Sequence, residues 1–139
     1  MMGAMTPTLV ALTGFITWTL LLLILMETIR SKLVVAKAIA ANAFVPDNSN
    51  LSPFMQRLAR VHANCLEGLP IFGGLMLAAV VSGRSAVTDP LAYVFLAARV
   101  LQSSVHLASM SVLAVKVRFG FFALQMAIGA YWAVRLLAA

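Results

Sequence analysis

Charged residues are scarce in this sequence. Asp, Glu, Lys and Arg make up 10% of its 139 residues, only four of them are acidic, and 63% of the residues are hydrophobic. The mean hydropathy is correspondingly high, at +1.00. Since soluble domains carry about 25% charged residues, this shortage argues against a soluble protein and indicates a membrane protein. The length is that of a single domain, which we take to cover residues 1–139.

Cysteine is almost absent as well. The single Cys65 can form no intrachain disulfide, so nothing points to an oxidising compartment, and we interpret it as a small apolar side chain. The first ten residues contain no Lys or Arg. They therefore lack the basic region of a secretory signal peptide, and we expect the first apolar segment to remain in the mature protein. We identify no metal-binding residues.

The chain contains long apolar runs instead of charged segments. A helix needs about 20 mostly apolar residues to cross a bilayer, and four segments approach or exceed that length. We therefore predict an all-α membrane protein, a bundle of four transmembrane helices. The apolar runs are Met1 to Met26, Gly68 to Gly83, Val100 to Val115 and Phe119 to Val134. The predicted helices span about 7–40, 53–82, 90–115 and 117–138, with a cytoplasmic loop at about 44–52.

Three of these helix starts are marked by an oxygen-bearing side chain followed by proline. The pairs are Thr6-Pro7, Ser52-Pro53 and Asp89-Pro90. The first residue of each pair can cap the helix, and proline fits the next position because its missing N–H would have no partner there. The fourth start has no such pair, and we place it near residue 117.

The net charge of +6 is better explained by topology than by a nucleic-acid partner, because Lys and Arg accumulate in cytoplasmic loops. We expect no nucleic-acid binding, and we expect both termini to face away from the cytoplasm. Arg135 counts against this orientation. The expected cytoplasmic basic residues are Arg30, Lys32, Lys37, Arg57, Lys116 and Arg118, whereas the second loop offers only Arg84 against Asp89.

The second helix carries a polar face in the stretch RVHANCLEGLP. Because successive helical residues turn by about 100°, Arg57, Arg60, Asn64 and Glu67 fall within an arc of about 80°. His62 points to nearly the opposite side. The apolar run after this stretch is short for a crossing, so the polar face must reach at least the edge of the hydrocarbon.

The third helix carries a matching polar face. Arg99, Gln102, Ser103 and His106 share an arc of about 100°, and Arg99 lies about 13 Å from the expected helix start. Measured from the shared outer loop, His106 and Glu67 lie at the same depth, about 24 Å. The two polar faces can therefore meet toward the cytoplasmic side.

Polar residues inside a membrane either hold helices together or form a functional site. For Arg99 alone we favour a structural role. For Arg60, Asn64 and Glu67, together with basic residues at the start of the fourth helix, we favour a binding site. Several cations around one carboxylate leave surplus positive charge, which suits a small anionic ligand. Pro70 frees a helical carbonyl, either to widen the bundle or without functional consequence.

The motif R-x-H-x-N-x-x-E, formed by Arg60, His62, Asn64 and Glu67, is followed by a proline and Phe72. It resembles the second-helix signature of the MAPEG family, the membrane-associated proteins of eicosanoid and glutathione metabolism. Chain length, four apolar helices and a long basic first loop are similar too. The resemblance implies a homotrimer that binds glutathione between subunits near the cytoplasmic face.

The resemblance also implies roles for individual residues. Arg60, Asn64 and Glu67 match the motif that contacts glutathione. Arg118, at the start of the fourth helix, matches the arginine that supports the thiolate, which makes it the candidate catalytic residue. In relatives the third helix reads R-x-x-[HY]-x-x-x-Y. Here the pattern begins at Arg99 but has Gln102 and His106 as the next candidates for the cofactor site, so both aromatic or imidazole positions of the pattern are altered.

The leading hypothesis is a glutathione-dependent transferase or peroxidase that acts on lipophilic electrophiles or lipid hydroperoxides arriving from the bilayer. The alternative is a non-catalytic lipid-binding scaffold, since one branch of the family, the lipoxygenase-activating protein, resembles such a scaffold. A small proton-coupled multidrug exporter is a third possibility. Those exporters carry a membrane-embedded glutamate in the first helix, whereas Glu27 lies at the cytoplasmic end of that helix.

Overall fold

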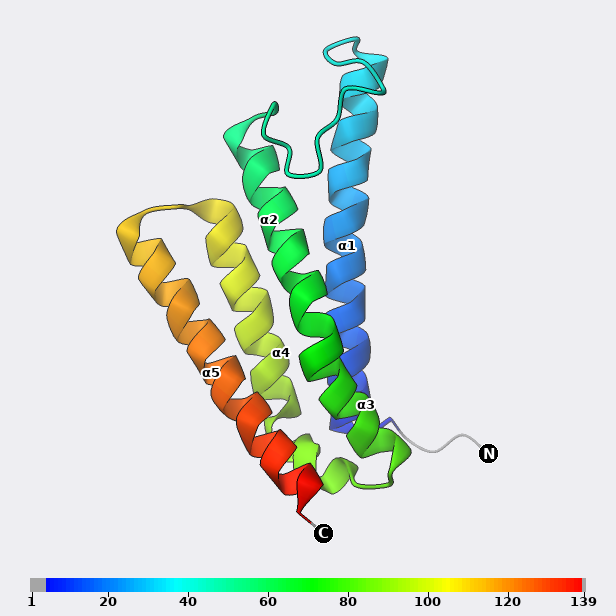
Figure 1. Ribbon diagram of the computed structural model, residues 1–139, viewed down its shortest axis with the longest axis vertical. Coiled ribbons are helices and arrows are strands. Elements are labelled where there is room, and N and C mark those ends of the chain that lie inside the picture. Colours follow the sequence, from blue (N-terminus) through cyan, green and yellow to red (C-terminus); the bar gives the residue numbers. More distant parts are fainter. Residues whose placement is uncertain (1–4, 139) are drawn as a thin grey trace.

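A computed structural model describes residues 5–138, which form a bundle of long helices (Figure 1). Four spans are long and apolar enough to cross a membrane. The chain is therefore an all-α, multi-pass integral membrane protein, as the sequence predicts. The elements are α1 (Pro7–Val35), α2 (Pro53–Gly68), the π-helix η1 (Leu69–Gly73), α3 (Gly74–Val81), α4 (Ser85–Ala108) and α5 (Val112–Leu137), with α2, η1 and α3 joined in one span.

The spans alternate in direction. The start of α1 and the end of α5 lie together with the 82–84 turn at what we call the terminal end, and segments 36–52 and 109–111 lie at the opposite, loop end (Figure 1). Helix α4 contacts all the other α-helices, whereas α5 packs chiefly along α4. In Figure 1 the helices converge toward the terminal end and fan out toward the loop end.

Helix α1 ends at Val35, about five residues before the predicted end. Lys37 adopts a left-handed conformation with φ of 58°. Its N–H donates to the carbonyl of Val34, and the N–H of Ala38 donates to the carbonyl of Leu33. These two bonds form a Schellman motif, which usually has glycine at the left-handed position. Because this position holds a lysine, the sequence does not indicate that the helix ends here.

Helix α4 begins at Ser85, five residues before the predicted start at Pro90, which lies inside the helix. Asp89 does not cap its own helix. Its carboxylate accepts hydrogen bonds from the backbone N–H of Thr8, at 3.0 Å, and from the Thr8 hydroxyl. The Asp89-Pro90 pair was misread because the aspartate serves the first turn of α1, across the bundle, and membrane helices tolerate proline.

Helix α5 begins at Val112 rather than near residue 117. The hydroxyl of Ser111 accepts from the backbone N–H of Ala114 at 3.1 Å and caps the helix without a proline after it. Only residues 109–111 separate α4 from α5. Lys116 and Arg118, predicted to lie at the boundary between the third and fourth helices, therefore lie within the first two turns of α5.

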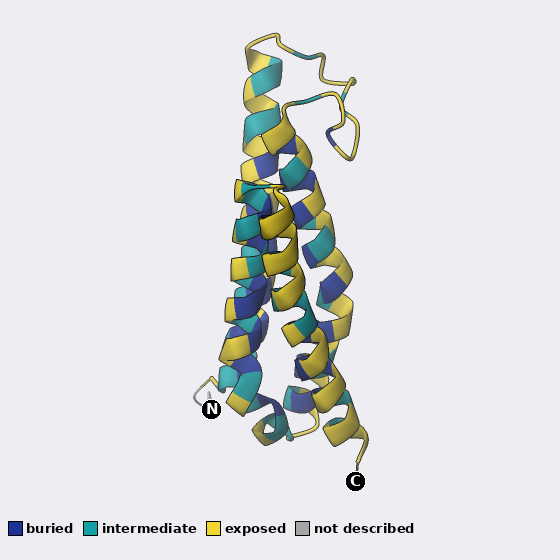
Figure 2. Ribbon diagram, turned by 90° about the vertical axis from the view of Figure 1, so that its left-hand side faces the viewer, coloured by how far each residue is buried: buried dark blue, intermediate teal, exposed yellow. Residues whose placement is uncertain are grey.

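Four buried aromatic rings form the core in the terminal half of the bundle. Phe95 of α4 has ring centroids of three neighbours within 4.9 to 5.7 Å: Phe15 of α1, Phe72 of η1 and Trp132 of α5. Each of the four comes from a different span, so this cluster joins all four spans. Figure 2 shows buried residues facing the inside of the bundle and exposed ones covering its outside.

Candidate functional site

Two cavities adjoin along the α2–α3 span and share Asn64 and Glu67 of α2. The polar cavity, of about 800 Å³, lies between the 46–49 loop, α2 and the end of α4. The apolar cavity, of about 650 Å³, lies between the α2–α3 span and α5, with α4 behind it. Both volumes are in the range of about 300–1,000 Å³ that is usual for small-molecule sites.

The polar cavity is lined by charges of both signs. Arg57 and Arg60 project from α2, Glu67 lies further along the same helix, and Asp47 comes from the loop. The sequence predicted surplus positive charge around a single carboxylate. The fold adds a second carboxylate, because the loop folds back over α2. A cavity with two guanidinium and two carboxylate groups suits a zwitterionic ligand better than a simple anion.

The wall that carries Asp47 is fixed by Asn48. This side chain is fully buried, and its residue has a left-handed φ of 57°. Its amide nitrogen donates to the carbonyl of Met55 at 2.7 Å, and its oxygen accepts from Arg30 Nε at 3.1 Å. The Arg30 guanidinium also donates to the carbonyls of Val45 and Pro46. These contacts tie the loop to α1 and α2, so the cavity has a preformed side.

His106 lies at the back of the polar cavity, 2% exposed, and its Nε2 has no hydrogen-bond partner. Arg57 Nε donates to the carbonyl of the neighbouring Leu107 at 2.9 Å and so joins α2 to the end of α4. The positive charges of Arg57, Arg60 and Arg118 all act on the His106 ring. The ring nitrogen without a partner can form a hydrogen bond with a ligand that enters the cavity.

Arg99 lies deep in the bundle beside the apolar cavity. It is only 1% exposed, and since α4 starts at Ser85 its Cα lies about 21 Å along the helix, deeper than predicted. Its guanidinium carbon lies 5.4 Å from the ring centroid of Phe15 and 6.0 Å from those of Phe72 and Phe122. Three aromatic faces therefore partly stabilise the cation.

The π-turn of η1 positions two residues against this arginine. Pro70 has no N–H to continue the α-helical ladder, and the helix widens to a π-turn over Leu69–Gly73. Within it Phe72 faces the Arg99 guanidinium, and just before it Gly68 allows a close approach. A Cβ on Gly68 would meet Arg99 Nη2 at 2.9 Å. The irregularity expected at Pro70 is thus a π-turn, and this turn shapes the cavity wall.

Gln102 lines the apolar cavity on the same face of α4 as Arg99. Its oxygen accepts from Gln125 Nε2 of α5 at 2.8 Å, and the same nitrogen donates to the Phe121 carbonyl. Gln125 is fully buried, and its own oxygen has no partner. The sequence interpretation missed Gln125, although an isolated glutamine in an apolar span was a visible signal. It also missed Asp47, whose place depends on how the loop folds.

The predicted site residues divide between the two cavities. Arg60 and His106 line the polar one, Arg99 and Gln102 line the apolar one, and Asn64 and Glu67 line both. Arg118 lines neither of them in the single chain and is half-buried on α5. His62 lies on the α1 side, where the charges of Glu27 and Arg30 act on it. It is therefore separate from the polar face, as its helical position predicts.

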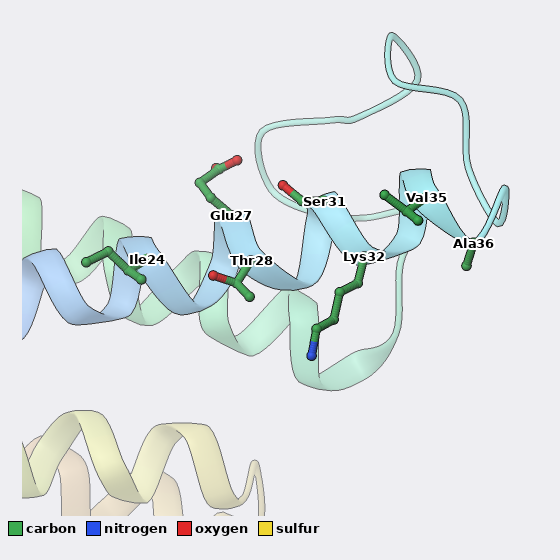
Figure 3. Close-up of a pocket in the computed structure, with 7 residues that line it drawn as sticks. All are labelled: Ile24, Glu27, Thr28, Ser31, Lys32, Val35 and Ala36. Carbon is green, nitrogen blue, oxygen red and sulfur yellow. The ribbon is translucent and has the colours of Figure 1, made fainter.

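A third hollow lies on the outer face of α1 (Figure 3). Figure 3 shows Glu27 and Lys32 pointing away from α1 in opposite directions. All the residues that line this hollow belong to α1 or directly follow it, and none of them is a candidate site residue. Its lining consists of Ile24, Glu27, Thr28, Ser31, Lys32, Val35 and Ala36.

The family comparison covers nearly the whole chain. The model of the MAPEG family matches residues 8–138, from the first turn of α1 to the end of α5. No curated protein and no solved structure matches the chain at a significant level. The match includes all four spans and both cavities. On this match, the chain belongs to the MAPEG family.

Proposed function

We propose that the protein is a glutathione-dependent transferase or peroxidase that acts on lipophilic electrophiles or lipid hydroperoxides. The observation that carries the proposal is the pair of adjoining cavities of opposite character that share Asn64 and Glu67. A water-soluble thiol fits one and a lipophilic acceptor fits the other. Membership of the MAPEG family supports a role in glutathione or eicosanoid metabolism in general terms.

Glutathione matches the polar cavity group by group. The tripeptide carries one ammonium and two carboxylates besides its thiol. In our proposal Arg57 and Arg60 bind the carboxylates, because guanidinium groups pair with carboxylates in a bidentate manner. Asp47 and Glu67 receive the ammonium, and Asn64 orients the peptide amides. The thiol then points toward the boundary with the apolar cavity.

The thiol must ionise to react, and a free thiol does so near pH 8.5. A nearby cation favours the thiolate at neutral pH. We assign this role to Arg118, whose charge acts on His106 at the back of the polar cavity. In a homotrimer, which we also propose, a neighbouring subunit closes cavities that are open in the single chain. The termini in this proposal face away from the cytoplasm.

Both reactions follow from this arrangement. In the transferase, the thiolate sulfur forms a bond to the electrophilic carbon, the leaving group departs with its electron pair, and the thiol proton passes to solvent. In the peroxidase, two thiols reduce one hydroperoxide: the O–O bond breaks, and the products are the disulfide, an alcohol and water. The protein contributes binding, orientation and stabilisation of the thiolate.

The test is an assay of the purified protein in detergent with glutathione and either 1-chloro-2,4-dinitrobenzene or a lipid hydroperoxide. Glu67→Gln keeps the shape of the side chain but removes its charge, and we expect it to raise the KM for glutathione about tenfold. Glu27→Gln is the matched control, because Glu27 makes only a surface ion pair with Arg30 and should change little. Absence of turnover across a panel of both substrate types would refute the proposal.

A non-catalytic lipid-binding scaffold remains the second candidate, and one observation favours it. Gln102 is engaged with Gln125, and His106 is buried without a partner for Nε2; these are the two positions at which the pattern of the relatives has His or Tyr and then Tyr. Equilibrium binding separates the two functions. A scaffold binds a lipid but shows no glutathione affinity that depends on Glu67 or Arg118.

A further inference from the structure

The loop end of α1 extends beyond the part of the helix that fits in the hydrocarbon of a bilayer. The run from Pro7 to Met26 has no charged residue and, at about 1.5 Å per residue, is about 30 Å long, which is the thickness of the hydrocarbon. The helix has 29 residues and continues to Val35, and Figure 1 shows it rising past the 109–111 connection. We therefore place the residues from Glu27 onward at the level of the lipid headgroups.

The outer face of α1 carries a row of exposed side chains spaced four residues apart. Ile16, Leu20 and Ile24 are 47%, 50% and 50% exposed. The row continues with Thr28 and Lys32, which line the hollow of Figure 3 together with Ile24. Consecutive members of such a row are neighbours on the helix surface. Toward the loop end the row therefore passes from apolar side chains to a hydroxyl and then to an ammonium group.

The two polar members of this row have no partner within residues 5–138. Lys32 forms no ion pair there, and the ion pair that α1 does contain joins Glu27 to Arg30. The Thr28 hydroxyl makes no hydrogen bond in the same part of the chain, whereas Thr19 of the same helix donates to the carbonyl four residues earlier. Figure 3 shows Thr28 and Lys32 pointing to the same side of α1. A single acceptor group can therefore bind to both side chains.

The charges around Thr28 and Lys32 favour an anionic partner. The Glu27 carboxylate is offset by Arg30, and Figure 3 shows it pointing away from Lys32. Lys32 therefore keeps an uncompensated positive charge, and Lys37, which is also exposed, follows just beyond the end of the helix. A phosphate group suits this place, because it is negatively charged and accepts hydrogen bonds from a hydroxyl and an ammonium group.

We propose that the outer face of α1 binds an anionic phospholipid, with the phosphate on Lys32 and Thr28 and an acyl chain along Ile24 and Leu20. The phosphate then lies at the level of the headgroups and the acyl chain in the hydrocarbon, which is the order of polar and apolar side chains along the row. Anionic lipids attract basic residues at a membrane surface. The inference does not depend on the proposed function, because the hollow shares no residue with either cavity.

The test is native mass spectrometry of the protein in detergent micelles, titrated with phosphatidylglycerol or with phosphatidylcholine of the same acyl chains. Both lipids carry the phosphate, but only phosphatidylcholine has a cation beside it. The native chain should bind the first phosphatidylglycerol about fivefold more tightly than the first phosphatidylcholine. Lys32→Gln should bring this ratio close to one, because it removes the uncompensated charge.

Two further variants separate the site from general attraction by charge. Lys116→Gln is the matched control, because it removes an exposed cation of α5 near the same end of the bundle, and it should leave the ratio unchanged. Thr28→Val keeps the shape of the side chain and removes its hydroxyl. It should weaken both lipids by the same factor, about threefold, since both carry the phosphate. All three substituted side chains are exposed, so the variants should fold.

Equal binding of the two lipids by the native chain would overturn the inference, as would unchanged affinities in Thr28→Val. An equal fall of the ratio in Lys32→Gln and Lys116→Gln would also overturn it, because net charge rather than a site would then attract the lipid. The same spectra report the oligomeric mass. A lower mass in Lys32→Gln would mean that this face binds a second copy of the chain instead of a lipid. Loss of the ratio in Lys32→Gln alone, at unchanged oligomeric mass, supports the lipid site.

Discussion

At the terminal end of the bundle Arg84 and Asp89 bond to groups of other helices, whereas toward the loop end several charged side chains line the polar cavity. At the terminal end Arg84 donates to the carbonyls of Arg135, Leu136 and Ala138 and so closes the end of α5. Asp89 does the same for the start of α1. In the loop half, buried nitrogens of His106 and Arg99 have no partner.

The two ends differ in the polar groups that they leave available for binding a ligand. Helix ends have unpaired N–H and C=O groups, and the terminal end satisfies several of them with its few charged side chains. Groups that are already paired have little left to offer a ligand. Toward the loop end Asn48 and Arg57 are paired as well, but Arg60 and Glu67 line the polar cavity. The aromatic core holds the spans in place. The paired groups at the terminal end therefore stabilise helix ends, whereas the polar groups that line the polar cavity can bind a ligand.

The largest expected effect is loss of stability from the aromatic core. Phe95→Ala removes the ring that contacts Phe15, Phe72 and Trp132 and should lower the free energy of unfolding by about 3 kcal/mol. Tyr93→Ala, on the same helix but 53% exposed, should cost little. Denaturant titration in detergent measures both variants. If Phe95→Ala costs no more than Tyr93→Ala, the terminal half is not the stabilising half.

The cap from Asp89 should have the next largest effect. Asp89→Ala removes both hydrogen bonds to Thr8 and should lower the free energy of unfolding by about 2 kcal/mol. Asp89→Asn retains an acceptor oxygen and should cost roughly half as much. Thermal unfolding ranks the two variants. Glutathione affinity should not change in either, and a change would mean that the two ends are coupled.

The smallest effect on stability is expected in the polar cavity. Arg60 is exposed, so Arg60→Ala should change the free energy of unfolding by less than about 0.5 kcal/mol. It should nevertheless weaken glutathione binding about fivefold, and less so in high salt, because the lost attraction is electrostatic. Calorimetric titration at two salt concentrations measures this. An equal loss in Arg135→Ala would point to net charge rather than to the cavity.

Much of the fold was predictable because it follows from composition and local pattern. Four apolar runs give four spans, and Thr6-Pro7 and Ser52-Pro53 stand where α1 and α2 begin. The errors lie where a side chain acts at a distance or replaces the usual residue. Asp89 caps another helix, and Lys37 takes a left-handed position that usually belongs to glycine. A single sequence carries no signal for either.

The arrangement of the candidate site residues was predictable to the extent that helical periodicity decides it. The arcs on the second and third helices bring Asn64, Glu67 and His106 to one cavity. Periodicity does not show how a loop folds or which side of a helix a neighbour covers. Asp47 and the division of Arg60 from Arg99 into separate cavities therefore emerged only in three dimensions.

The bond between Asp89 and Thr8 also bears on the order in which the protein is made. The two residues are 81 positions apart in the chain. While the ribosome is still producing the second span, α1 can already cross the bilayer, but its first turn lacks this acceptor. The acceptor arrives with the third span. The first turn of α1 therefore gains this acceptor only when the third span has been made, and truncation before α4 should weaken that turn, which then keeps only the cap from Thr6.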